Sequence, residues 1–263
     1  MSGTLYLIPT PLGDTALNQV LPEATRRIVA GLTTFIVEHP KTARAFLRQV
    51  DTALPLQQLT LLGLNEHTQP HELVALLAPL LTGQDVGLIS EAGCPAVADP
   101  GADLVRLAHG HGIRVKPLVG PSSILLALMG SGLVGQRFAF HGYLPAKPEK
   151  RARALRALEK RAETEDAAQI FIETPYRNIA MLEAILSTCR GDTLLTLACD
   201  LTLETEQLMT RPVQHWRAAE DMLLSRRPCV FLLYRRKPPV CPQSPLPGRQ
   251  CDPGAPRSGH RTR

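Results

Sequence analysis

The stretch Ile89-Ser90-Glu91-Ala92-Gly93-Cys94-Pro95-Ala96-Val97-Ala98-Asp99-Pro100-Gly101 is a loop of small residues and prolines that directly follows the apolar run at 85–89. Gly93 and Gly101 permit backbone conformations that side chains forbid, and the two prolines stiffen the turn. Main-chain amides can therefore approach a bound molecule closely. The next run, 102–112, has the pattern of a helix whose N-terminus would face that molecule. The stretch thus predicts a strand, a ligand-binding loop and a helix in succession.

On either side of this loop, short apolar runs alternate with amphipathic stretches. We expect strands at 4–8, 33–37, 59–64, 86–89 and 113–119. Helices are expected at 23–30, 42–50, 71–81 and 102–109, where leucine, valine and alanine recur at three- and four-residue spacings. This alternation predicts an α/β fold with a mostly parallel sheet, which binds ligands at the carboxyl ends of its strands.

The second half of the chain begins at a Gly-Pro-Ser-Ser turn, residues 120–123, followed by an apolar helix at 124–129. Further strands are expected at 138–143, 169–172, 193–199 and 229–234, with helices at 149–163 and 177–188. We therefore predict an N-terminal α/β domain at 1–119, a C-terminal α/β domain at 120–237 and a tail at 238–263.

The net charge of +5 is concentrated in the tail. Residues 238–263 hold four arginines against one aspartate, and they also hold seven of the 23 prolines. Without apolar periodicity, this composition predicts disorder. The chain has no run of about 18 apolar residues and no signal-peptide pattern, so we expect a soluble, cytoplasmic protein without a membrane segment.

The cysteines and histidines give no metal signature. No two of the six cysteines have the close spacing of a zinc knuckle or a redox pair, and the eight histidines are equally scattered. We expect no bound metal and reduced, structural thiols at Cys94, Cys189, Cys199, Cys229, Cys241 and Cys251.

Three loops share the same proline-rich style, each after a predicted strand. They occupy residues 9–14, 90–101 and 120–123. Any one of them could be an ordinary turn, but in a parallel sheet all three would emerge at one edge and could enclose a small ligand. The chain lacks both the G-x-G-x-x-G pattern and a phosphate loop ending in Gly-Lys-Ser or Gly-Lys-Thr, which argues against NAD and ATP.

Five segments together resemble the tetrapyrrole methylase superfamily. They are Pro-Thr-Pro-Leu-Gly at 9–13, the loop at 90–101, Val-Gly-Pro-Ser-Ser at 119–123, Gly-Tyr-Leu-Pro-Ala-Lys at 142–147 and Ile-Glu-Thr-Pro-Tyr-Arg at 172–177. The resemblance runs in order from about residue 4 to residue 236. Within the superfamily the chain is similar to the branch that methylates a cytidine ribose 2'-hydroxyl of small-subunit ribosomal RNA.

This resemblance implies a homodimer of two-domain α/β subunits that bind S-adenosylmethionine, folded up, in the cleft between the domains. Most of the implied cofactor contacts are small residues or offer backbone groups, which suits a ligand whose carboxylate and adenine edge need amide donors and carbonyl acceptors. They are Pro11, Leu12, Glu91, Ala92, Gly93, Ala96, Ser122, Ser123, Glu173 and Leu201.

Glu38 directly follows the strand predicted at 33–37, and the resemblance implies a proton-accepting carboxylate near this position in some members. It is our candidate general base, the alternative being an acid paired with Lys41 or Arg44. The chain reads Glu-His-Pro-Lys at 38–41 where the branch usually has Glu-Asp-Thr-Arg, and Glu91 stands where the family has aspartate. These departures bear on the nucleotide target more than on the cofactor. Lys41 and Arg177 are candidate substrate contacts, although Arg177 could equally be a plain surface arginine.

The stretch 147–161 holds seven basic residues against two acidic ones. On a helix, Arg153, Arg156 and Lys160 share one face, while Leu155 and Leu158 turn inward. The basic face is either a solvated exterior or a strip that follows RNA phosphates, with Arg153 and Arg156 as substrate contacts. Aromatic residues for base stacking are few.

The function predicted from these features is S-adenosylmethionine-dependent methylation of a ribose 2'-hydroxyl in small-subunit (16S) ribosomal RNA. The expected partners are ribosomal RNA or the small subunit and a second copy of the chain. Two alternatives stay open: methylation of a precorrin-type tetrapyrrole, and a catalytically silent RNA-binding paralogue. The clustering of cations on one helix favours an extended polyanion over a macrocycle.

Overall fold

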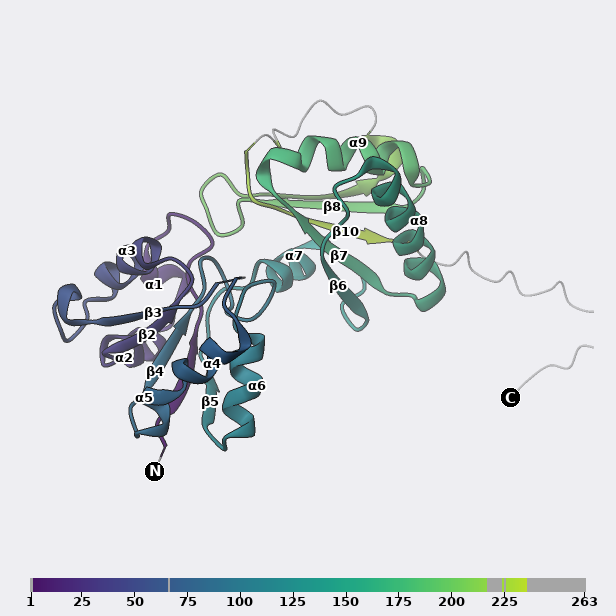
Figure 1. The fold of residues 1–263 in the computed structure, drawn as a ribbon. Helices are drawn as coiled ribbons and strands as arrows, with labels where there is room; N and C mark the ends of the chain where they lie inside the picture. The colour runs from purple at the N-terminus through teal and green to yellow at the C-terminus, as the bar shows by residue number, and fades with distance from the viewer. Residues whose placement is uncertain (1, 66, 217–223, 225, 236–263) are drawn as a thin grey trace, which may run out of the picture.

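The computed structural model describes residues 2–65, 67–216, 224 and 226–235, and it contains two five-stranded sheets (Figure 1). The first sheet lies in the N-terminal half of the chain and the second in the C-terminal half. Helix α7 (Ser123–Ser131) follows the last strand of the first sheet and packs against the second sheet. The α/β fold class predicted from the sequence is confirmed.

Every strand pairing in the first sheet is parallel, as predicted. The strand order is β3-β2-β4-β1-β5. All five strands were anticipated to within two residues at each end: β1 (Thr4–Ile8), β2 (Thr34–Val37), β3 (Thr60–Gly63), β4 (Val86–Ile89) and β5 (Arg114–Pro117). Because the strands run in one direction, the loops that follow them leave from one edge of the sheet.

Helices cover both faces of the first sheet. Successive side chains of β2 point to opposite sides, so Phe35 and Val37 pack in one core cluster and Ile36 in the other. The helices of this half are α1 (Leu17–Val20), α2 (Glu23–Ala30), α3 (Pro40–Val50), α4 (Pro70–Leu76), α5 (Ala78–Leu81) and α6 (Ala102–Gly110), together with the 3-10 turn η1 (Leu56–Gln58).

One predicted helix, 71–81, is divided in two. Helix α4 ends at Leu76 and α5 begins at Ala78, with Pro79 in the first turn of α5. Proline has no backbone N–H and its ring clashes with the preceding turn, so it begins a helix more readily than it continues one. The apolar spacing of the sequence continues across this break, which is why periodicity alone did not reveal it.

The second sheet is mixed, with the strand order β6-β7-β10-β8-β9. Strands β6 and β7 are parallel, and the other pairings are antiparallel. Four of the strands were predicted, but β9 was not. Its Gln, Thr, Arg and Pro residues give no apolar alternation, and among the strands that the structure describes it pairs only with β8. The strands are β6 (Phe138–Tyr143), β7 (Ala168–Glu173), β8 (Leu194–Cys199), β9 (Gln207–Pro212) and β10 (Cys229–Tyr234).

Different helices pack on the two faces of the second sheet. Leu155 and Leu158 of α8 (Pro148–Glu165) and Met181 of α9 (Asn178–Thr188) belong to one core cluster with the stacked rings of Phe171 and Phe231. Ala127 and other residues of α7 belong to the cluster on the opposite face. The remaining short elements are the 3-10 turn η2 (Pro175–Arg177) and α10 (Val213–Trp216).

The expectation that all cysteines are reduced is wrong for one pair. Cys199 of β8 and Cys229 of β10 form a disulfide, with their Cα atoms 4.3 Å apart. They are directly opposite each other in the antiparallel pairing, and their separation of 30 residues hid this from a search for close spacing. Cys94 and Cys189 are not part of this disulfide, while Cys241 and Cys251 lie outside the described residues.

Two further expectations concern the C-terminal tail and membrane-spanning helices. The tail predicted at 238–263 lies outside the described residues. Within the described part of the chain, no helix has the length and apolar character needed to cross a bilayer.

Candidate functional site

A cavity of about 340 Å³ lies where the two halves of the chain meet. Its volume falls in the range of small-ligand sites. Its walls come from the loops after β1 and β4, the start of α7, and strands and loops of the second sheet. The lining residues are Leu12, Glu91, Ala92, Val97, Ala98, Asp99, Ser123, Ile124, Phe140, Tyr143, Ile172, Glu173, Thr174, Pro175, Ala198, Asp200, Leu201, Pro228, Cys229 and Val230.

The three proline-rich loops are joined to one another, as predicted for loops at one edge of a parallel sheet. Backbone hydrogen bonds link Thr10 and Gly93 in both directions, at 2.9 and 3.1 Å. The Cys94 thiol donates to the Pro121 carbonyl oxygen at 3.4 Å. These contacts fix the loops at 9–14, 90–101 and 120–123 as a single wall of the cavity.

The backbone of the loop at 90–101 is held in conformations that are costly for ordinary side chains. Gly93 has φ +79°, and a Cβ there would lie 3.2 Å from a methyl carbon of Leu12. Ala96 and Ala98 have φ values of +64° and +62° although they are not glycines. Each such residue costs about 1 kcal/mol or more, and strain of this kind is concentrated at functional sites.

Six of the ten predicted cofactor contacts line the cavity: Leu12, Glu91, Ala92, Ser123, Glu173 and Leu201. Pro11 lines an adjoining hollow of about 240 Å³ that shares Leu12, Glu91 and Ala92 with the cavity. Gly93, Ala96 and Ser122 shape the surrounding backbone, and the Ser122 side chain accepts a hydrogen bond from the Leu125 N–H at 3.5 Å as the cap of α7.

Glu173 has one satisfied and one unsatisfied carboxylate oxygen. Its Oε1 accepts hydrogen bonds from the Thr174 N–H at 2.7 Å and from Arg177 Nη2 at 2.6 Å. Its Oε2 is buried and has no hydrogen-bond partner within the described residues. Because the side chain is fully buried and lines the cavity, a donor on a bound ligand can satisfy this atom.

Arg177, a candidate substrate contact that would hold a phosphate, forms an ion pair with Glu173. Its side chain is 39% exposed and that of Glu173 is fully buried. The guanidinium therefore neutralises a buried carboxylate and still has a face open to solvent.

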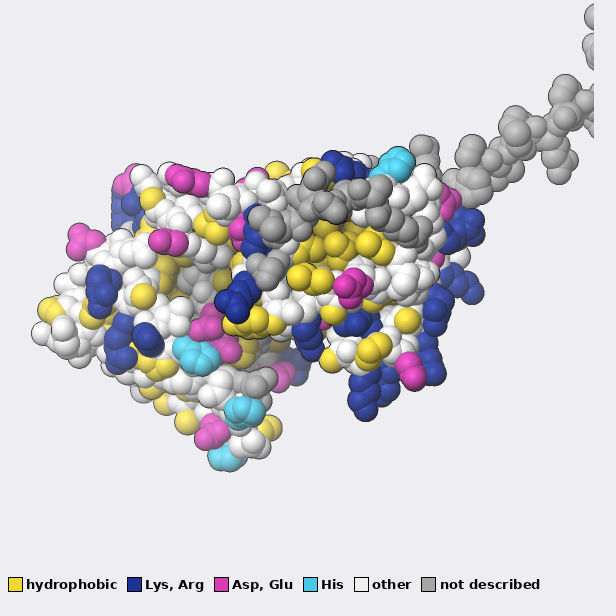
Figure 2. Space-filling view, turned by 90° about the horizontal axis from the view of Figure 1, so that it is seen from above, with side chains coloured by type: hydrophobic (Ala, Val, Ile, Leu, Met, Phe, Trp, Pro, Cys, Tyr) yellow, Lys and Arg dark blue, Asp and Glu magenta, His cyan; other side chains and the backbone are white. Residues whose placement is uncertain are grey.

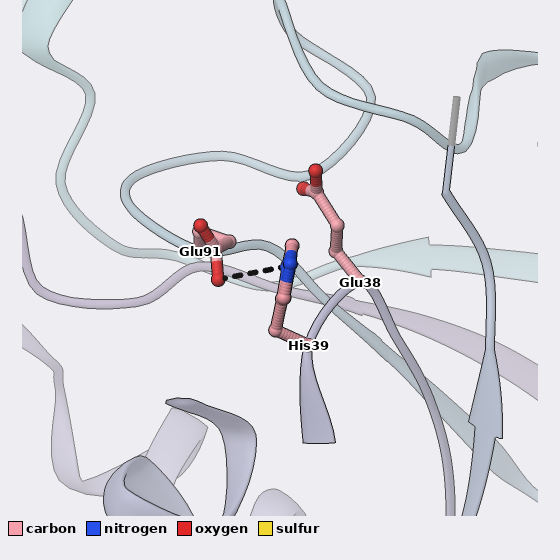
Figure 3. Close-up of side chains that lie close together, drawn as sticks. All are labelled: Glu38, His39 and Glu91. Atoms are coloured by element: carbon pink, nitrogen blue, oxygen red, sulfur yellow. Dashed lines mark ion pairs between the residues drawn. The ribbon is translucent and has the colours of Figure 1, made fainter. Parts of the chain in front are cut away.

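Glu38 lies beside the cavity and is not among its lining residues. His39 Nδ1 is 3.3 Å from Glu91 Oε1 (Figure 3). The same oxygen accepts a hydrogen bond from the Thr42 hydroxyl at 3.0 Å. Ligand atoms of Glu38, His39 and Glu91 all lie within 4.8 Å of one another. This is a possible cation site, but the His39 and Glu91 side chains are 63% and 43% exposed and pair with each other, so we assign no metal to it. Lys41 is exposed in the first turn of α3.

Asp99 is a cavity residue that the sequence interpretation missed. Burial, and then the charges of Glu38 and Glu91, raise its pKa from an ordinary 3.8 to about 6. Its Oδ2 is buried without a hydrogen-bond partner in the described part of the chain. The available signal was an ionisable side chain inside a loop of small residues. Burial, followed by the charges of Asp99 and Glu173, also raises the pKa of Tyr143, another missed cavity residue.

The predicted basic face of α8 lies away from the cavity. Leu155 and Leu158 are buried as expected, while Arg153, Arg156 and Lys160 are exposed. Figure 2 shows lysine and arginine side chains along the edge of the C-terminal half, at the right of the view. Helix α8 packs on one face of the second sheet, whereas the cavity residues Ile172 and Val230 belong to the cluster on the other face.

Comparison with known proteins identifies the family of this chain. Residues 4–215 match the Tetrapyrrole (Corrin/Porphyrin) Methylases. The chain belongs to the tetrapyrrole methylase family. It is 35% identical to the Ribosomal RNA small subunit methyltransferase I of Escherichia coli O157:H7, over 80% of this chain and 70% of that protein. The enzyme of the same name from Pseudomonas aeruginosa is 32% identical, over 88% and 79%.

Solved structures with low sequence identity share the fold. The methyltransferase CobJ superimposes with a TM-score of 0.59 at 17% identity, covering 89% of this chain and 94% of its own. A uroporphyrin-III C-methyltransferase from Thermus thermophilus, complexed with S-adenosylhomocysteine, gives a TM-score of 0.53 at 16% identity, over 88% and 97%.

This tetrapyrrole methylase is a methyltransferase that uses S-adenosylmethionine. The cavity fits that cofactor. Glu173 Oε2 can accept from an amino or hydroxyl group, Glu91 and Asp99 can face a sulfonium cation, and Ile172 and Val230 offer apolar contact. When bound, the cofactor supplies an activated methyl group with a neutral thioether as the leaving group.

Proposed function

We propose that this protein methylates a ribose 2'-hydroxyl in small-subunit ribosomal RNA. The supporting observation is that relatives named Ribosomal RNA small subunit methyltransferase I match the chain at 30–35% identity over most of its length. This substrate implies a cytoplasmic location. We also propose that the domain boundary lies between residues 119 and 120, just before α7.

The charge distribution supports a large folded RNA as substrate. The exposed basic face of α8 and the cavity belong to opposite faces of the second sheet. A single nucleotide in the cavity cannot reach α8, whereas a ribosomal RNA that passes around the edge of the sheet can contact both. Arg153, Arg156 and Lys160 would then bind phosphates and contribute affinity without choosing the sequence.

The lining of the cavity argues against a tetrapyrrole. Within the described residues it includes Glu91, Asp99, Glu173 and Asp200 but no lysine or arginine. Glu173 and Asp200 are ion-paired with Arg177 and Arg227, so the charges of Glu91 and Asp99 are the ones that would oppose the acid groups of a macrocycle. A ribose presents hydroxyl groups to the same carboxylates, which can accept hydrogen bonds from them.

The reaction requires alignment more than strong chemical activation. The hydroxyl oxygen forms a bond to the methyl carbon, the carbon–sulfur bond breaks, and the hydroxyl proton passes to a base. Enclosure of both reactants between the two halves brings them into line and excludes water, and such positioning can supply several kcal/mol of the barrier reduction, on the order of 7 or more. Glu38 remains a candidate for this base.

The experiment is methyl transfer to small ribosomal subunits from cells that lack this gene, followed by mapping of ribose methylation. We expect one ribose methylated only when protein and cofactor are both present. Methylation of a purified tetrapyrrole but not of the subunits would favour the first alternative. Absence of S-adenosylhomocysteine binding in calorimetry, together with retained RNA binding, would favour the silent paralogue.

A further inference from the structure

We infer that Asp99 is the catalytic base, which removes the proton from the attacking ribose hydroxyl through its buried Oδ2 atom. This assignment rests on the proposed function, because it requires a hydroxyl substrate. Under this assignment Glu38 is not the base. It is a neighbouring charge that raises the pKa of Asp99.

The position of Asp99 satisfies the geometric requirement for a base. It lines the cavity, whereas Glu38 does not. It is held between Ala98, which has φ +62°, and Pro100, so its backbone is fixed next to a strained residue. A side chain that is held in place loses little entropy when it meets a substrate.

Asp99 also differs from the other cavity carboxylates in its partners. Glu91 accepts from Thr42 and pairs with His39, and Glu173 pairs with Arg177. The remaining one, Asp200, pairs with Arg227 at 2.7 Å and accepts from Thr205 at 2.8 Å. Within the described residues, Asp99 Oδ2 has no such donor. Glu173 Oε2 also lacks a donor, but the Glu173 carboxylate is neutralised by Arg177. Among the described residues that line the cavity, Asp99 is therefore the carboxylate that has an unsatisfied acceptor and no cationic partner, which suits it to receive a substrate proton.

The electrostatic surroundings strengthen Asp99 as a base. Glu38 approaches it from the β2–α3 connection and Glu91 from its own loop. Tyr143 of β6 also lines the cavity, and the charge of Asp99 contributes to its raised pKa. His39 Nδ1 lies 3.3 Å from Glu91 Oε1. Glu173 and Arg177 of the second half act on Tyr143 with opposite signs. With a pKa near 6, Asp99 is ionised at pH 7.5 yet holds a proton more tightly than an ordinary aspartate.

The atoms balance in this step. The ribose oxygen forms the new bond to the methyl carbon as the methyl–sulfur bond breaks, and that electron pair leaves on sulfur as a neutral thioether. The hydroxyl proton passes to Asp99 Oδ2. It then exchanges with solvent when product leaves, so no oxidant, reductant or metal is required.

The first test compares Asp99→Asn with Asp103→Asn, an exposed neighbour on α6 that forms a surface ion pair with Arg106. We expect Asp99→Asn to lower single-turnover methyl transfer to small ribosomal subunits by about 100-fold or more. Calorimetric affinity for S-adenosylhomocysteine should stay within about threefold of wild type, since the substitution removes a proton acceptor and keeps the shape. Asp103→Asn should match wild type in both measurements.

The second test measures Asp99 without turnover. In protein labelled with 13C at aspartate carboxyls, the resonance that disappears in Asp99→Asn should titrate near pH 6. Glu38→Gln should move that midpoint downward because it removes one negative neighbour. The rate of wild type should rise with pH to a plateau, with a midpoint at or below that of the free protein, because a sulfonium beside Asp99 lowers its pKa. Glu38→Gln should shift this profile in the same direction as the resonance.

The outcomes separate the two proposals. An active wild type together with an equally active Asp99→Asn variant would overturn the role of Asp99 alone, as would a resonance that titrates near pH 4. A wild type that transfers no methyl group to RNA would overturn the proposed function and this assignment with it. Loss of turnover in Glu38→Gln, with Asp99→Asn unaffected, would return the role of base to Glu38.

Discussion

Asp99 links the chemistry of the site to the stability of the fold. Its pKa in the folded protein, about 6, lies above the ordinary value of 3.8. Between these pH values the folded state holds a proton that the unfolded state has released. The free energy of unfolding therefore falls as pH rises through this window, so the ionised form needed for base catalysis is also the less stable form.

We predict that Asp99→Asn removes this pH dependence. Because Asp99 is only half-buried and solvent screens its charge, we expect the variant to gain about 1 kcal/mol relative to wild type between pH 4 and pH 7.5. Urea unfolding at the two pH values measures this difference. Asp103→Asn, on an exposed side chain, is the control and should change by less than about 0.5 kcal/mol. An identical pH dependence in Asp99→Asn and wild type would contradict the raised pKa.

Arg177 is partly exposed, but it forms an ion pair with a carboxylate inside the protein. Its partner Glu173 is fully buried, so removal of the guanidinium leaves a carboxylate in the cavity wall without a counter-charge. We predict that Arg177→Ala lowers the free energy of unfolding by about 2 kcal/mol, less than for a fully buried pair because the arginine is partly exposed. Chemical denaturation measures this change, and Arg153→Ala, on the exposed face of α8, should alter stability by less than about 0.5 kcal/mol. Equal, small effects in both variants would favour a role for Arg177 in phosphate binding alone.

At the scale of elements, α8 combines a buried apolar face with an exposed basic one. We predict that Arg153→Glu with Arg156→Glu weakens binding to ribosomal RNA and reduces the slope of log affinity against log salt by about 2, one for each phosphate that is no longer neutralised. Filter binding across a series of salt concentrations measures this. The control, Arg27→Glu with Arg48→Glu, makes the same change in charge on α2 and α3. An equally weakened control would mean that net charge matters and position does not.

The first sheet was predictable because each of its elements is encoded locally. Short apolar runs followed by amphipathic stretches predicted five parallel strands, and the loops between them predicted one wall of the site. Strand β9 was not predictable in this way, since its polar residues become a strand only by pairing with β8. The Cys199–Cys229 disulfide depends likewise on the pairing of β8 with β10.

The distinction between locally encoded features and features that depend on distant residues also applies within the site. Glycines and prolines revealed the loop at 90–101 from the sequence, because their backbone properties do not depend on distant residues. The surroundings of Asp99 do depend on distant residues. Glu38 comes from the β2–α3 connection and Tyr143 from the other half of the chain. A lone aspartate in a loop therefore gave no sign of its role until the fold brought these residues together.

At the scale of the whole molecule, α7 links the cofactor site to an exposed apolar surface. Ser123 and Ile124 at its start line the cavity, and Ala127 packs against the second sheet. Its outer face carries Leu125 and Met129, one turn apart and 50% and 79% exposed. Apolar side chains exposed in this way favour an interface, and we propose that a second copy of the chain covers them.

We predict that Met129→Glu converts a dimer into a monomer, because the carboxylate would be buried without a partner in a two-fold interface. Sedimentation velocity measures the change. Val74→Glu, at another exposed apolar position, on α4, provides the control and should leave the dimer intact. Because α7 also begins at the cavity, the monomer should bind S-adenosylhomocysteine less tightly than wild type in calorimetry. A wild type that already sediments as a monomer would contradict the dimer, and the outer face of α7 would then be free to meet the ribosomal subunit.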